Sequence, residues 1–127
     1  MTDLTYEGRI AFTARYDGDG IASGEMEVQP GILNPFGTVH AGAMIWFADV
    51  VATRLVLGEA EVSAGMKGFP LAVNLNANLL GNTREGRLTA RAEYVKQGRR
   101  LSVVRTRVTR PDGRLLIEMT TSHVPSE

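Results

Sequence analysis

The residue with the clearest chemical potential is Asp49, which stands in the middle of an apolar run over residues 39–57. The run contains no proline and predicts a helix of about five turns that ends at Gly58. A carboxylate in such a helix loses its water unless it is paired or faces a cavity, and burial makes it more basic. Asp49 is therefore a candidate general base or carboxylate nucleophile. The alternative is a structural aspartate that Arg54, Thr53 or a backbone donor satisfies.

A second group of candidate residues precedes this helix in the segment 34–42, which reads Asn-Pro-Phe-Gly-Thr-Val-His-Ala-Gly. Small and turn-forming residues leave backbone N–H groups accessible at a helix N-terminus, where the helix dipole favours negative charge. The N–H groups of Ala41 and Gly42 are candidates to hold the oxyanion of an acyl-transfer reaction. The alternative is that Gly37 and Gly42 only permit a sharp turn and close packing. His40 taken alone is more often an interior histidine with satisfied hydrogen bonds than a catalytic one.

A third candidate feature is a basic turn with three positive charges in five residues, at Lys96, Arg99 and Arg100. Such a turn can contact a phosphate-bearing ligand, although Lys and Arg at turns are commonly just solvated. The polar turn over residues 82–87 is of the same kind and less specific.

Composition excludes several functional classes. Fourteen Lys and Arg balance fourteen Asp and Glu, so no overall field favours nucleic acid or an anionic membrane. The chain has no cysteine and only His40 and His123, which argues against a zinc site. The first residues lack the pattern of a signal peptide, so a cytoplasmic location is expected. Asp49 and Arg54 inside the apolar run argue against membrane insertion.

The remaining elements are predicted from period-two alternation and turn residues. A length of 127 residues predicts a single domain over residues 1–127. A glycine-rich turn over residues 17–20 predicts a hairpin, and turn formers crowd residues 30–37. Strands are predicted over 10–16, 21–28, 71–79, 88–94, 101–110 and 114–124. The predicted fold is α+β, with one antiparallel sheet wrapped around a long central helix. The outer face and the edges of this sheet are expected to meet another subunit.

The spacing of five residues, followed by four strands, resembles the hotdog-fold acyl-CoA thioesterases of the PaaI-like group. These residues are Asn34, Gly37, His40, Gly42 and Asp49. The family pattern places an acidic residue seven positions after the second glycine of a His-Gly-Gly motif, and Gly42 and Asp49 keep that interval. The resemblance implies subunits that join their sheets as a homodimer or homotetramer, with active sites between them.

The resemblance also implies a role for each matching residue. Asp49 would activate a water or attack the thioester carbonyl, and the N–H of Ala41 would donate to the oxyanion. Asn34 and His40 would shape the loop, and Asn34 would orient the water from the subunit opposite Asp49. The basic turn at residues 96–100 matches the region where relatives bind the nucleotide end of coenzyme A.

Two residues depart from the family pattern. Ala41 replaces the first glycine of the usual pair, and alanine is strained wherever a positive φ is needed. Ala72 stands where some relatives carry an assisting hydroxyl, for which Thr53 is the candidate substitute. Candidates to line an acyl pocket are Met44, Trp46, Phe47 and Phe69.

The predicted function is hydrolysis of an acyl-CoA or aroyl-CoA thioester without metal or redox cofactor. The alternative is a hotdog protein that binds acyl-CoA or another apolar ligand without turnover. A hydratase on this scaffold is disfavoured, because the aspartate and histidine that such enzymes place five residues apart are not seen. The sequence leaves open the acyl group, dimer against tetramer, and base against nucleophile for Asp49.

Overall fold

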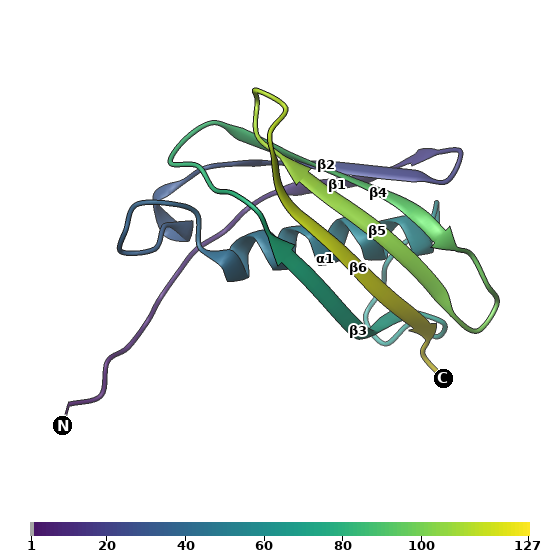
Figure 1. Ribbon diagram of the computed structural model, residues 1–127. Coiled ribbons are helices and arrows are strands. Elements are labelled where there is room, and N and C mark those ends of the chain that lie inside the picture. Colours follow the sequence, from purple (N-terminus) through teal and green to yellow (C-terminus); the bar gives the residue numbers. More distant parts are fainter. Residues whose placement is uncertain (1) are drawn as a thin grey trace.

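The computed structural model describes residues 2–127 and contains a six-stranded antiparallel sheet with one long helix across one of its faces (Figure 1). The strands are β1 (Thr13–Gly18), β2 (Ile21–Glu27), β3 (Pro70–Leu79), β4 (Arg87–Lys96), β5 (Ser102–Thr109) and β6 (Leu115–Pro125), in the order β1-β2-β4-β5-β6-β3. A short 3-10 helix, η1 (Pro30–Ile32), precedes α1 (Ala41–Leu57). This arrangement confirms the predicted α+β fold.

Helix α1 contacts all six strands through one face. Its fully buried residues recur at helical spacing and form the centre of the core: Met44, Phe47, Ala48, Val51, Ala52 and Leu55. Within the described residues 2–127 the opposite face is only partly covered, since Trp46 remains 50% exposed. The sequence predicted cover on most sides, whereas one sheet reaches only one side of the helix. Within residues 2–127, no helix is long and apolar enough to cross a membrane.

The hairpin of β1 and β2 forms as predicted, although β1 begins three residues later than the sequence suggested. Residues 10–12 precede β1, and the side chain of Gln29 holds Ala11 in place. Its Oε1 accepts the Ala11 N–H at 3.3 Å, and its Nε2 donates to the Ala11 carbonyl at 3.1 Å. A side chain therefore replaces the strand ladder at this point, which alternation in sequence does not reveal.

Strand β3 lies at the edge of the sheet beside β6. The pairing register slips between Ala72 and Asn74, so the strict alternation predicted over residues 71–79 is broken at Val73. Four large apolar side chains of this strand are exposed: Leu71, Val73, Leu75 and Leu79. A long apolar edge strand is a surface on which another strand can pair.

Candidate functional site

The loop before α1 is closed by its own side chains. Asn34 Nδ2 donates to Thr38 Oγ1 at 2.9 Å, and Asn34 Oδ1 accepts the Thr38 backbone N–H at 3.1 Å. Gly37 has a φ of 89°, and a Cβ at this position would lie 2.5 Å from Arg84 Nη1. The positive φ favours glycine there, whereas the Arg84 side chain could move aside for a Cβ. The amide of Asn34 fixes the loop that leads the chain into the helix.

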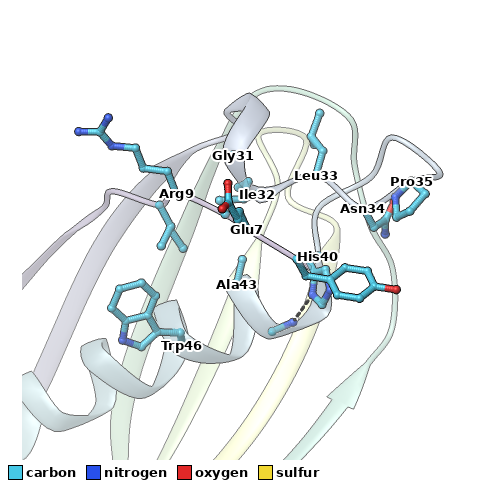
Figure 2. A pocket seen from close by; sticks show the side chains of 14 residues that line it. Glu7, Arg9, Gly31, Ile32, Leu33, Asn34, Pro35, His40, Ala43 and Trp46 are labelled. Atoms are coloured by element: carbon cyan, nitrogen blue, oxygen red, sulfur yellow. Dashed lines mark hydrogen bonds between the residues drawn. The ribbon is translucent and has the colours of Figure 1, made fainter. Parts of the chain in front are cut away.

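His40 is the N-cap of α1. Its Nδ1 accepts the backbone N–H of Gly42 at 3.1 Å (Figure 2), so the ring proton lies on Nε2. Among the residues that the structure describes, the N–H of Ala41 has no hydrogen-bond acceptor. Ala41 does not have a positive φ, so its methyl group causes no backbone strain. Of the two predicted oxyanion donors, only the N–H of Ala41 is unoccupied.

Asn82 is a further residue of this site, which sequence reasoning assigned to an unspecific polar turn. Its Oδ1 accepts the backbone N–H of Val39 at 3.1 Å, and its Nδ2 donates to the Val39 carbonyl at 2.8 Å. The backbone N–H of His40 donates to the carbonyl of Ile32 at 2.7 Å. These bonds fix the chain immediately before Ala41. No local signal could reveal Asn82, because it is 43 residues away in sequence from the backbone it holds.

We expect Asn82→Ala to lower the free energy of unfolding by about 1–3 kcal/mol, because the partly buried Val39 carbonyl loses its side-chain donor. The Val39 N–H would keep only the Thr83 carbonyl, at 3.2 Å. Urea denaturation measures this change. Gln97→Ala, which removes an amide from an exposed turn, is the control and should stay within about 0.5 kcal/mol of the wild type. Equal stability of the two variants would contradict the role of Asn82.

Asp49 lies on the other flank of α1 and lines a cleft of about 330 Å³ between the helix and the start of β3. Thr53, Phe69 and Ala72 line the same cleft. The Oδ1 of Asp49 is buried and has no hydrogen-bond partner in the described part of the chain. Burial raises the pKa of Asp49, and the nearby His123 opposes this shift to a smaller extent. The result is an unneutralised carboxyl group of raised basicity beside a cavity.

Arg54 is not the partner of Asp49. Its Nη2 donates to the carbonyls of Gly58 at 2.9 Å and Ala60 at 2.5 Å, which closes the C-terminal end of α1. The structural alternative in which Arg54 neutralises Asp49 is therefore not observed.

The residues proposed for the nucleotide end of coenzyme A lie near the C-terminal end of α1. Arg99 and Arg100 are exposed and line a cavity of about 180 Å³ together with Val56 of the helix and His123 of β6. Lys96 is exposed at the end of β4 and does not line this cavity. His123 is buried between the Thr121 hydroxyl, 2.7 Å from Nε2, and the Pro70 carbonyl, 3.3 Å from Nδ1.

One chain does not bring all predicted site residues together. Asn34, His40 and Gly42 line a cavity of about 640 Å³ at the N-terminal end of α1 (Figure 2), whereas Asp49 lines the separate cleft beside β3. Ala41 and Asp49 are eight residues apart in one helix, which corresponds to about 12 Å along its axis. A single reacting carbonyl cannot reach both within one chain.

Comparison with known proteins gives consistent matches. The model of the thioesterase superfamily matches residues 36–117. A curated Haemophilus influenzae protein, named as an esterase, is 32% identical over 81 residues, or 61% of this chain; the match spans 54% of that relative, about half its length. A Staphylococcus aureus thioesterase structure is 26% identical, with a TM-score of 0.79 over 91% of this chain and 93% of its own.

A Streptococcus pneumoniae structure, described as a hypothetical thioesterase with coenzyme A, is 21% identical. It has a TM-score of 0.78 over 91% of this chain and 88% of its own. At this identity the likeness concerns the fold.

Proposed function

Because the chain belongs to the thioesterase superfamily and has its hotdog fold, we propose that it hydrolyses an acyl-CoA or aroyl-CoA thioester to a free acid and coenzyme A. The observation that carries this proposal is the half-buried carboxyl group of Asp49, whose buried Oδ1 has no hydrogen-bond partner in the described residues and which lines a cleft. The coenzyme A bound to the Streptococcus pneumoniae relative supports a ligand of this type.

The proposed reaction divides the work between Asp49 and Ala41. As general base, the Asp49 carboxylate takes a proton from water, and the resulting hydroxide attacks the thioester carbonyl. The negative charge that develops on the carbonyl oxygen is held by the N–H of Ala41. The C–S bond then breaks, and the proton on Asp49 passes to the departing thiolate. As nucleophile, the Asp49 carboxylate would instead attack the carbonyl and expel the coenzyme A thiolate as the C–S bond breaks, which leaves a mixed anhydride. Water then hydrolyses the anhydride to the free acid and the Asp49 carboxylate, and the proton released goes to the thiolate.

A second copy of the chain completes the proposed site. The separation of about 12 Å between Ala41 and Asp49 requires that they act on one carbonyl from different subunits. Antiparallel pairing of two helices about a two-fold axis brings the N-terminal end of one α1 towards the middle of the other. The same pairing brings Arg99 and Arg100 of the partner towards the entrance, because they lie at the C-terminal end of its helix.

The exposed edge of β3 supports such a homodimer. Its apolar side chains and unpaired backbone groups fit a second β3 strand in antiparallel orientation, which would continue the sheet across the two subunits. Pairing two such dimers would give a homotetramer. Both assemblies keep the proposed active sites between subunits.

The sequence separation of Asn34 and Asp49 provides further support. Two crystal structures of the Staphylococcus aureus thioesterase carry alanine in place of a glutamine and of a glutamate. These two residues have the same separation in that chain as Asn34 and Asp49 have here. This favours Asn34 as the side chain that orients the water for Asp49 of the opposite subunit.

The test of the proposed function is release of free thiol from a panel of acyl-CoA and aroyl-CoA esters. Turnover of at least one ester, lost in Asp49→Asn, is the expected result. Saturable binding by calorimetry with no thiol release across the panel would overturn the proposal and favour the alternative, a non-catalytic protein that binds acyl-CoA.

The shared site predicts complementation between two inactive variants. A refolded equimolar mixture of Asp49→Asn and Ala41→Pro chains should regain about one quarter of the wild-type activity, because half of the dimers are mixed and each has one intact site. Thiol release by each variant alone and by the mixture measures this gain. Activity of the mixture no higher than that of the separate variants would place the site within one chain.

A further inference from the structure

The cavity at the N-terminal end of α1 has a wall that the family match does not include. The family model matches residues 36–117, whereas much of the wall comes from residues 6–10, here called the N-terminal strap. The other walls are residues 31–35 and the first turns of α1 (Figure 2). The cavity measures about 640 Å³, within the range of small-molecule sites.

The strap is seated on η1 by direct backbone contact. The Arg9 N–H donates to the Gly31 carbonyl at 3.1 Å. A Cβ at Gly31 would lie 2.3 Å from the Arg9 carbonyl oxygen and 2.9 Å from the Arg9 nitrogen, so no other residue fits without displacing the strap. The Gln29 amide holds Ala11 just beyond the strap. The strap is therefore a defined wall of the cavity.

Trp46 presents an aromatic surface to the same cavity. Its side chain is half exposed, and its ring stands at 86° to the ring of Phe12 with centroids 5.2 Å apart. This edge-to-face contact fixes the indole orientation. Apolar neighbours from three segments also line the cavity: Ile10, Ile32 and Ala43. The polar part of its lining includes Glu7, Arg9 and Asn34. In Figure 2, Trp46, Ala43 and His40 follow one another along one side of the helix.

We propose that this cavity receives the acyl group, with a preference for ring-bearing acyl groups, and that the strap, Gly31 and Trp46 set this preference. The inference rests on the proposed function, which places the thioester carbonyl at the N–H of Ala41. His40 and Gly42, the residues on either side of Ala41, line the cavity. A thioester carbonyl at Ala41 therefore has a mainly apolar space beside it, in which the charged side chains are Glu7 and Arg9 of the strap. A planar ring in that space gains contact with the fixed indole, which a short alkyl chain does not.

Trp46 is the only tryptophan of the chain, so its fluorescence reports directly on the occupant. The probes are coenzyme A, S-hexyl coenzyme A and S-phenacyl coenzyme A. None of them can be hydrolysed, because coenzyme A has no acyl group and the other two are thioethers. We expect S-phenacyl coenzyme A to change the emission saturably and more strongly than the other two. An identical change with coenzyme A alone would overturn the inference.

Gly31→Ala tests the strap by the same titration, because the three atoms nearest to the added Cβ all belong to the Arg9 backbone. The expected result is binding of S-phenacyl coenzyme A about tenfold weaker, with little difference for coenzyme A. Equal weakening for both probes would contradict an acyl-specific wall. Circular dichroism verifies that Gly31→Ala is folded. Trp46→Ala provides an independent second test of the acyl preference.

Kinetics of Trp46→Ala separate specificity from general damage. The KM for benzoyl-CoA should rise about tenfold more than the KM for acetyl-CoA, and Trp46→Phe should restore most of the difference. Equal changes for the two esters would overturn the inference. Hydrolysis without an acyl-dependent Trp46 signal would reject the inference and keep the proposed function. A Trp46 signal without hydrolysis of any ester would reject the function and keep the cavity as an acyl-binding site.

Discussion

Ala41→Pro should lower kcat for thioester hydrolysis by about 10²–10³, the usual effect of removing one oxyanion donor. Proline replaces the backbone N–H by a ring carbon, and within the described residues this N–H has no acceptor to lose. The first position of a helix favours proline. His40, with φ of −63° and ψ of 133°, already has the extended conformation that a residue before proline requires.

The measurement is steady-state thiol release, together with a thermal melt that verifies the fold. Ala41→Ser and Ala41→Gly are the matched controls, because both retain the N–H and both are tolerated at the start of a helix. They should lose far less activity than Ala41→Pro. Full activity of Ala41→Pro would exclude the Ala41 N–H from the oxyanion site.

Asp49→Asn should lower kcat/KM by about 10²–10⁴, because it removes the general base and preserves the size of the side chain. Asp19→Asn is the matched control: it makes the same chemical change in the exposed turn between β1 and β2, where asparagine also accepts the positive φ. That variant should retain wild-type activity. If Asp49→Asn retained it as well, Asp49 would have no part in the reaction.

The raised pKa of Asp49 predicts two further results, one for the pH dependence of activity and one for the pH dependence of stability. Activity requires the carboxylate, so the acid limb of kcat/KM should report an apparent pKa above the ordinary aspartate value of 3.8. Because the folded pKa exceeds the unfolded one, the folded state binds more protons between these values, and stability falls as pH rises through that window. Asp49→Asn should therefore be more stable than the wild type at pH 7, with the difference vanishing below pH 3.8. Thermal melts across pH measure this.

The elements of the fold could be predicted from the sequence because they depend on local periodicity. The apolar run over residues 39–57 gave the helix, and alternation gave strands within a few residues of their observed bounds. The first strand and β3 differ, since the Gln29 amide and the register slip at Val73 are long-range features. Asp49 could also be identified from local sequence, because it is a charged residue within an apolar helix.

Contacts between distant segments decided the rest of the site. Asn82 holds Val39 from across the molecule, and His40 occupies the Gly42 N–H, which leaves Ala41 as the unoccupied donor. The strap rests on Gly31 through backbone contacts that depend on neither side-chain pattern nor charge. Residue types and their local spacing identify the side chains that have the chemistry. Which of these side chains share a cavity depends on the folded chain, because hydrogen-bond partners and enclosed space come from segments far apart in sequence.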